Sequence, residues 1–163
     1  MTAGGSSIPE VQRLLSVLAA AKPHGRIAEI GTAFGEGAAA ILDALGPNAK
    51  LVTVEADPER HAHSAQVLDD PRVEVLHAYW EDVLPERGPF DLIFFDGGTR
   101  ADSLGLAIEL LAAGGILIKD DLTPGTPIQG DAVREAFLKD ERLVGAELLV
   151  TDEMAVIIAT RRS

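Results

Sequence analysis

The sequence predicts an α/β protein with a Rossmann-like, doubly wound sheet of seven strands that is mostly parallel and has helices on both faces. Short apolar runs alternate with helical stretches along most of the 163 residues, and a glycine-rich turn follows the first of these runs. The last two apolar runs, at 144–150 and 154–160, are separated by only three residues. A connection that short cannot cross over a sheet, so these two strands must form an antiparallel hairpin.

The first half of the chain predicts a helix followed by three strands and two further helices. Apolar residues at helical spacing mark the first helix at 8–22, and Ser7-Ile-Pro-Glu10 ahead of it fits a capping box with proline in the first turn. The elements expected after it are a strand at 26–30, a helix at 37–45, a strand at 50–54, a helix at 57–69 and a strand at 72–76.

The second half continues the alternation. The run at 90–95 is almost continuously apolar, which is typical of a strand covered on both faces. A helix at 102–112, a strand at 116–119, a helix at 131–140 and the terminal hairpin are expected after it. Because no linker, repeat or low-complexity segment interrupts the pattern, the whole of 1–163 is expected to be a single domain.

The glycine turn is the most informative motif. Gly31, Gly35 and Gly37 lie between a predicted strand and a predicted helix. Glycine permits positive φ and lets a backbone approach a ligand closely, and a helix N-terminus offers unpaired N–H groups. The turn is therefore expected to hold a small cofactor against bare backbone.

Glu55 ends the second predicted strand, 24 residues after Gly31. In nucleotide-binding α/β units, an acid at this position accepts hydrogen bonds from ribose hydroxyls. The turn and the acid together predict a ligand that contains adenosine. The glycine spacing is GxxxGxG, which differs from the GxGxxG of dinucleotide binding.

Composition excludes several classes of function. The chain has 26 acidic and 14 basic residues, a formal charge of −12, and such a surface repels nucleic acid and anionic membranes. The absence of cysteine excludes disulfides, zinc thiolate sites and thiol nucleophiles. Without a basic leader or a long apolar run, a cytoplasmic protein is expected.

These motifs resemble those of the class I S-adenosylmethionine-dependent methyltransferases, and within them the small-molecule O-methyltransferases similar to catechol and caffeoyl-CoA enzymes. The resemblance covers nearly the whole chain and is strongest at 29–37, Glu55, 90–96 and 114–121. It implies S-adenosylmethionine as the cofactor, a small hydroxylated molecule as the methyl acceptor, and a homodimer as the assembly.

The resemblance also implies a set of cofactor-binding residues. The loop at Gly31 would cradle the methionine part, Glu55 the ribose, and the segment after the third strand the adenine. The expected residues are Glu29, Gly31, Thr32, Ala33, Phe34, Gly35, Gly37, Glu55, Ala56, Ala78, Tyr79, Trp80 and Asp96. Two alternatives stay open: Glu29 either binds the cofactor amine or only hydrogen-bonds loop amides, and Trp80 either stacks on adenine or fills the core.

Three carboxylates, Asp96, Asp120 and Asp121, end adjacent predicted strands and repel one another unless a cation or protons intervene. By the resemblance, they would bind a divalent metal such as Mg²⁺, which chelates vicinal hydroxyls of the acceptor, and Asp96 would be catalytic. Asp121 stands where the family has Asn. Alternatively, Asp96 contacts cofactor or loop amides, Asp120 and Asp121 cap a turn, and Lys119 neutralises one of the carboxylates.

One departure from the family concerns the base, because Thr99 stands where the family commonly has lysine and the adjacent Arg100 is a poor base. A non-catalytic cofactor-binding or dimerisation domain is therefore the alternative to an enzyme. A short-chain dehydrogenase is disfavoured, since Tyr79 is followed four residues later by Val83 and not by lysine. The Asn/Asp-Pro-Pro-aromatic motif of many nucleic-acid methyltransferases is also missing.

Overall fold

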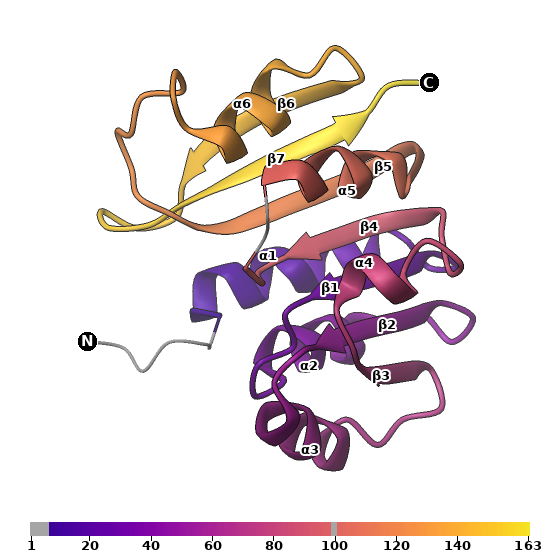
Figure 1. Cartoon of the computed structure of the whole chain (residues 1–163). Helices are drawn as coiled ribbons and strands as arrows, with labels where there is room; N and C mark the ends of the chain where they lie inside the picture. The colour runs from indigo at the N-terminus through magenta and orange to yellow at the C-terminus, as the bar shows by residue number, and fades with distance from the viewer. Residues whose placement is uncertain (1–6, 99–100) are drawn as a thin grey trace.

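The computed structural model describes residues 7–98 and 101–163, which form a seven-stranded sheet between two layers of helices (Figure 1). The elements are α1 (Pro9–Ala20), β1 (Arg26–Ile30), α2 (Glu36–Ala44), β2 (Lys50–Glu55), α3 (Pro58–Val67), β3 (Val73–His77), α4 (Trp80–Val83), β4 (Phe90–Phe95), η1 (Ala101–Ser103), α5 (Leu104–Glu109), β5 (Leu111–Leu122), α6 (Ala132–Lys139), β6 (Leu143–Leu149) and β7 (Ala155–Arg161).

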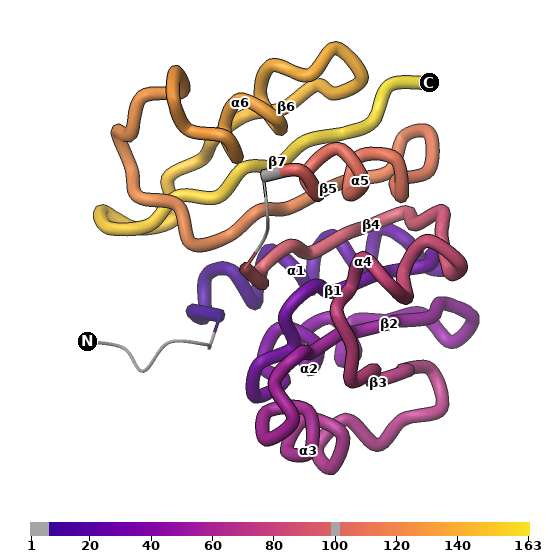
Figure 2. The backbone as a smooth tube through the Cα atoms, in the orientation of Figure 1, coloured from indigo at the N-terminus to yellow at the C-terminus, as the bar shows by residue number. Residues whose placement is uncertain are grey.

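The strand order is β3-β2-β1-β4-β5-β7-β6, which confirms the predicted fold class. Strands β1 to β5 pair in parallel, whereas β7 pairs antiparallel with both β5 and β6. The tube in Figure 2 shows the tight turn that joins β6 to β7. The order reverses between β1 and β4, and open α/β sheets bind ligands beside the carboxyl ends of the strands at such a reversal.

The core has two parts, one on each face of the sheet. Phe94 of β4 packs with apolar residues of α1 and α2, while Phe95 packs with those of α4, α5 and α6. Both phenylalanines are fully buried. This explains why β4 is almost continuously apolar: a strand covered on both faces buries every side chain.

The start of α1 differs from the capping box expected at Ser7. The helix begins one residue later, with Ile8 at the N-cap and no side-chain capping bond, although proline does occupy the first turn as predicted. The buried hydroxyl of Ser7 hydrogen-bonds Asp96, and its carbonyl accepts a 2.7 Å bond from the Gln12 amide. A tertiary contact therefore uses the side chain that the motif assigned to the helix.

The region before β5 is the largest departure from the expected boundaries. The predicted helix at 102–112 is a 3₁₀ turn followed by the six-residue α5, and β5 begins at Leu111. Its register against β4 shifts before Ile116 pairs with Leu92. Gly114 has φ +72° in this irregular stretch. Gly114 and Gly115 thus lie in a bulge inside a longer strand, between the expected helix at 102–112 and the expected strand at 116–119.

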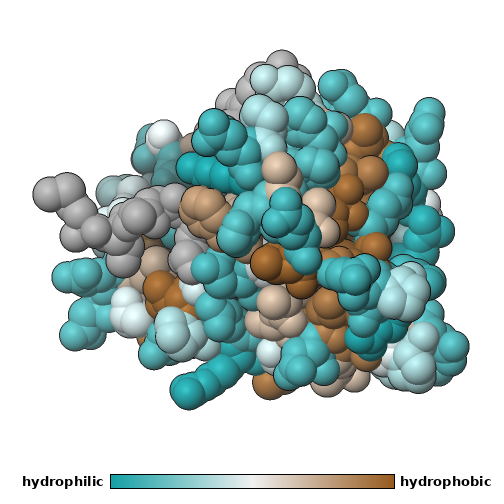
Figure 3. All heavy atoms as spheres, turned by 90° about the horizontal axis from the view of Figure 1, so that it is seen from below, coloured by the Kyte–Doolittle hydropathy of each residue, from teal (hydrophilic) through white to brown (hydrophobic). Residues whose placement is uncertain are grey.

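The four-residue helix α4 was not predicted, because one turn is too short to show a helical period. It follows β3, the strand at one edge of the sheet. Figure 3 views the molecule from below, where this edge lies in Figure 1, and shows mostly hydrophilic residues with apolar ones gathered between them. In the part of the chain that is described, no helix combines the length and apolarity needed to span a membrane.

Candidate cofactor cavity and acidic cluster

A cavity of 510 Å³ opens at the carboxyl edge of the sheet. Its walls come from the ends of β1, β2 and β4 and from the segment after β3. The lining residues are Ile30, Gly31, Val54, Glu55, Ala56, Ala78, Tyr79, Trp80, Glu81, Asp82, Gly97 and Gly98. Six of the expected cofactor residues are among them: Gly31, Glu55, Ala56, Ala78, Tyr79 and Trp80.

Gly31 lies where the loop after β1 passes close to the loop after β4. Its φ is +90°, and a Cβ at this position would lie 2.6 Å from both the N and the Cα of Gly97. The Gly31 N–H donates a 2.9 Å bond to the carbonyl of Val54. Only glycine satisfies both the backbone conformation and this spacing, so the floor of the cavity is bare backbone.

Glu55 is 8% exposed, and its carboxylate organises the cavity rim. It accepts a 2.8 Å bond from the N–H of Ala33 and a 2.9 Å bond from the N–H of Asp57. These two bonds join the glycine turn to the start of α3. A carboxylate has about four lone-pair sites, so Glu55 can accept further bonds from a ligand in the cavity.

The wall formed by 78–82 combines an exposed ring with a buried one. Tyr79 is 69% exposed, whereas Trp80 is 5% exposed and meets Phe95 edge-on at 5.6 Å between ring centroids. Trp80 thus fills the core and lines the cavity at once. Its indole Nε1 is buried with no hydrogen-bond partner among the described residues, which is rare unless a ligand or water supplies one.

Four polar or glycine positions of the lining were missed from the sequence: Glu81, Asp82, Gly97 and Gly98. Glu81 accepts a 2.9 Å bond from the hydroxyl of Ser103, which ties the wall to the turn after β4. The available signals were the acids directly after Trp80 and the glycine pair directly after Asp96.

The remaining expected residues of the glycine turn do not line the cavity. Glu29 is 1% exposed beneath the turn, and its carboxylate accepts a 2.5 Å bond from the Thr53 hydroxyl, which also contacts the Thr32 hydroxyl at 2.5 Å. Its second oxygen fills the space that a side chain at Gly37 would need. Phe34 is 45% exposed and lies edge-on to His63.

The turn thus supports the cavity by packing. Gly35 is the N-cap of α2, with φ +96°, and the N–H of Ala33 is held by Glu55. The pKa of Glu29 is raised from 4.5 to about 8, mainly by burial, with the carboxylates of Asp96, Glu55 and Glu36 contributing to the rise and the Thr53 hydrogen bond opposing it.

A second feature adjoins the cavity, namely the predicted cluster of Asp96, Asp120 and Asp121, which we call the acidic cluster. One carboxylate oxygen from each residue lies within 4.8 Å of the others. Asp120 is 1% exposed and accepts a 2.8 Å bond from the N–H of Asp121. Asp121 has φ +60°, a left-handed conformation that is uncommon outside glycine and costs strain.

The pKa of Asp96 is raised to about 7, mainly by burial and also by the carboxylates of Asp120 and Asp121, while Lys119 and the Ser7 hydrogen bond oppose the rise. Burial also raises the pKa of Asp120. For Lys119, burial lowers the pKa and the three aspartates oppose that effect. Hard oxygen ligands at this spacing, with charge that the protein only partly compensates, fit a divalent cation such as Mg²⁺. Thr99, the expected position of the base, lies outside the described residues.

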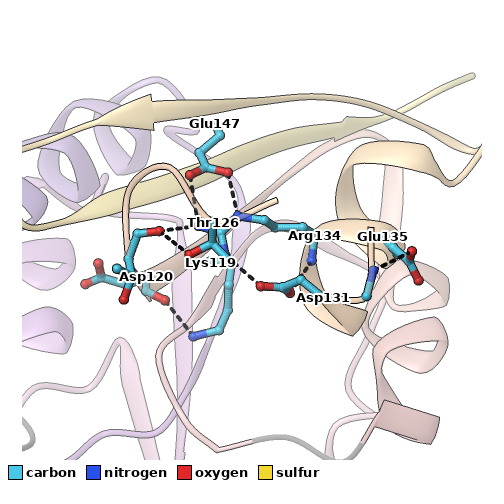
Figure 4. A network of polar contacts seen from close by, with 9 residues as sticks. Lys119, Asp120, Thr126, Asp131, Arg134, Glu135 and Glu147 are labelled. Carbon is cyan, nitrogen blue, oxygen red and sulfur yellow. Dashed lines mark hydrogen bonds and ion pairs between the residues drawn. The ribbon is translucent and has the colours of Figure 1, made fainter. Parts of the chain in front are cut away.

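Arg134 holds the loop after the acidic cluster through a network of polar contacts (Figure 4). Its side chain is 2% exposed. Its guanidinium donates to the carbonyl of Thr123 at 2.7 Å and pairs with Asp131 at 2.7 Å and with Glu147 at 2.8 Å. A buried guanidinium with several acceptors is rigid. The loop at 123–131 is therefore tied to α6 and β6.

Comparison with known proteins places these features among methyltransferases. The family described as "Methyltransferase domain" matches residues 28–122. A catechol O-methyltransferase of Mycobacterium tuberculosis is 32% identical over 130 residues, covering 74% of this chain and 58% of the relative. A ribosomal RNA small subunit methyltransferase H of Shewanella loihica is 36% identical over 91 residues, covering 51% of this chain and 28% of the relative.

The chain thus spans less than two thirds of the length of either of these relatives. Among solved structures, an O-methyltransferase of Bacillus cereus in complex with SAH (S-adenosylhomocysteine) superposes with a TM-score of 0.80 at 19% identity. The superposition covers 98% of this chain and 84% of that one. This likeness supports the fold.

Proposed function

The chain belongs to the class I S-adenosylmethionine-dependent methyltransferases and resembles their catechol and caffeoyl-CoA O-methyltransferases, and from this membership we propose that it transfers a methyl group from S-adenosylmethionine to a hydroxyl oxygen of a small molecule. The observation that carries the proposal is the 510 Å³ cavity, which combines bare backbone at Gly31 with a strand-end acid at Glu55. S-adenosylmethionine supplies an activated methyl group on a sulfonium.

Different residues of the cavity bind different parts of S-adenosylmethionine in this proposal. The Gly31 backbone holds the methionine part, Glu55 accepts from the ribose hydroxyls, and Ala78 and Tyr79 flank the adenine. The unpartnered Nε1–H of Trp80 is a donor for a buried acceptor atom of the ligand. Ala56 lines the rim beside Glu55. Glu29, Thr32, Ala33, Phe34, Gly35 and Gly37 act by shaping the turn.

The acids around the cavity favour a cationic ligand. The carboxylates of Asp96, Glu55 and Glu36 each raise the pKa of Glu29, and no described lysine or arginine is among the influences resolved for it. A positive sulfonium and amine lower the cost of keeping these carboxylates ionised. The site is therefore expected to bind S-adenosylmethionine in preference to neutral adenosine compounds.

Transfer requires an in-line approach of the acceptor oxygen to the methyl carbon. An O–C bond forms, the C–S bond breaks with its electron pair left on the sulfur of S-adenosylhomocysteine, and the hydroxyl proton passes to solvent. Asp96 directly precedes the glycines of the cavity and belongs to the acidic cluster, so we assign it the orientation of the acceptor hydroxyl. A divalent cation held by Asp96, Asp120 and Asp121 would lower the pKa of a chelated hydroxyl.

The test is formation of S-adenosylhomocysteine from S-adenosylmethionine with a panel of catechols and other hydroxylated aromatics, in Mg²⁺ and in chelator. Acceptor-dependent turnover supports the proposal. Cofactor binding without turnover on any acceptor favours the non-catalytic alternative. Turnover confined to ribosomal RNA, as the name of the Shewanella loihica relative suggests for that protein, would contradict the small-molecule acceptor.

A further inference from the structure

Lys119 is a buried lysine inside the candidate site. It belongs to β5 and is 8% exposed. Alternate residues of a strand point to opposite faces, and Leu117 packs with the α4–α6 layer whereas Ile118 packs with the α1–α2 layer. Lys119 shares the face of Leu117, and its ammonium lies 5.8 Å from the ring centroid of Phe95. It therefore approaches the acidic cluster from the opposite face to Asp120.

The Lys119 ammonium uses only part of its hydrogen-bonding capacity among the described residues. Among the described residues, its hydrogen bond goes to the backbone carbonyl of Asp120 at 2.7 Å (Figure 4). An ammonium has three donors, and burying one is costly unless nearby charge compensates it. The charges that act on it are the carboxylates of Asp96, Asp121 and Asp120.

Lys119 in turn acts on the carboxylates of the acidic cluster. Lys119 is the cation that acts on both Asp96 and Asp120. With all groups ionised, three carboxylates and one ammonium carry a formal −2, so one divalent cation would neutralise the group. The ammonium, which already donates to the backbone carbonyl of Asp120, would then lie beside that cation in partly buried protein, where like charges repel strongly.

We propose that Lys119 is the built-in counter-ion of the acidic cluster and that it weakens divalent-cation binding there, so that the identity of residue 119 sets the metal affinity of this chain. The inference rests on the metal site of the proposed function, but it concerns cation binding and not methyl transfer. In chelator, Lys119 keeps the three carboxylates together. In Mg²⁺, the bound ion must overcome its repulsion.

The test is Mn²⁺ binding by calorimetry and electron paramagnetic resonance to the whole chain and its variants. Lys119→Met and Lys119→Gln remove the charge, and glutamine retains a donor for the Asp120 carbonyl. Both are expected to bind Mn²⁺ at least tenfold more tightly than wild type. Lys119→Arg keeps the charge and is expected to bind as wild type does. Lys139→Met is the matched control, because Lys139 is 53% exposed and pairs only at 3.7 Å with Glu135.

Thermal unfolding gives a second readout that does not need turnover. In chelator, Lys119→Gln is expected to melt below wild type, since the carboxylates have lost their counter-ion, and Mn²⁺ should raise its Tm by more than it raises that of wild type. Equal Mn²⁺ affinity in wild type and Lys119→Gln, or no Mn²⁺ binding to either, would overturn the inference. S-adenosylhomocysteine affinity of the same samples, which reports on the proposed function, separates the two claims.

Discussion

Glu55 ends β2 and Asp96 directly follows β4, and these two strands flank β1 in the sheet. The surroundings of the two carboxylates nevertheless differ. The carboxylate of Glu55 is held by two backbone N–H groups within 3 Å and lines the cavity. Asp96 has the Ser7 hydroxyl as a partner and faces two further carboxylates, which together with burial raise its pKa to about 7. Backbone groups of the protein thus satisfy the carboxylate of Glu55, whereas Lys119 and Ser7 only partly offset the effect of burial and of the neighbouring carboxylates on Asp96.

The cavity and the acidic cluster, which form the two ends of the site, should therefore respond to different ligands and substitutions. The cavity around Gly31 and Glu55 is organised by backbone, so its ligand affinity should depend on sterics and hydrogen bonds and little on metal. The acidic cluster is organised by charge, so it should respond to cations and to residue 119.

The largest effect is expected at the floor of the cavity. Gly31→Ala places a Cβ 2.6 Å from the Gly97 backbone at a φ of +90°, so we expect a loss of about 4 kcal/mol of unfolding free energy, together with the cofactor site. Urea unfolding and cofactor titration measure both. Gly105→Ala is the control, since nothing lies within 4 Å of its added Cβ. A stable Gly31→Ala protein that binds normally would contradict the packing described.

The second prediction concerns Glu29, buried beneath the turn. Its folded-state pKa of about 8 lies above the ordinary value of 4.5, so the folded state holds the extra proton. The resulting stability is fully present below pH 4.5 and is lost as pH rises through about 8. Between pH 5 and 8, wild type should lose on the order of 3 kcal/mol more than Glu29→Gln.

Glutamine at position 29 can still accept the hydrogen bond from Thr53, so the comparison isolates ionisation from packing. Urea unfolding at a series of pH values measures it. A Glu29→Gln protein whose stability falls with pH as steeply as that of wild type would show that Glu29 ionises at its ordinary pKa in the folded protein.

The third prediction compares a carboxylate of the cavity, Glu55, with a carboxylate of the acidic cluster, Asp121. Glu55→Gln removes a charged acceptor of ligand and loop bonds, and we expect S-adenosylhomocysteine to bind about 30-fold more weakly, or ~2 kcal/mol. Asp121→Asn, in the acidic cluster, should leave that affinity within about twofold because its partners are other carboxylates. Calorimetric titration of both variants checks this, and equal losses would abolish the distinction between the two ends.

The smallest effect is expected at the exposed wall. Tyr79 is 69% exposed, so stacking there contributes little, and Tyr79→Ala should weaken S-adenosylhomocysteine binding about fivefold, or ~1 kcal/mol. Tyr79→Phe keeps the ring and should bind within about twofold of wild type. A loss of more than a hundredfold in Tyr79→Ala would mean that the ring closes over the ligand.

Sequence reasoning predicted the mostly parallel sheet with its terminal hairpin, because apolar runs and short connections are local features of the chain. The turn and the strand-end acid likewise pointed to Gly31 and Glu55, whereas Ala56 and 78–80 were expected from the family resemblance, and all of these line the cavity. It missed α4 and the true start of β5, because one helical turn and a bulge have no periodic signal. The separation of Glu29 from the cavity depends on the packing of Thr53 and Gly37, which a strand pattern does not contain.

The most direct test of the account is calorimetric titration of S-adenosylmethionine into the wild-type protein in the presence of a chelator. We expect saturable one-to-one binding without metal, because the cavity is completed by backbone and by Glu55 and not by the acidic cluster. Absence of binding in chelator by a folded protein would contradict it, and rescue of that binding by Mg²⁺ would show that the acidic cluster organises the cavity as well.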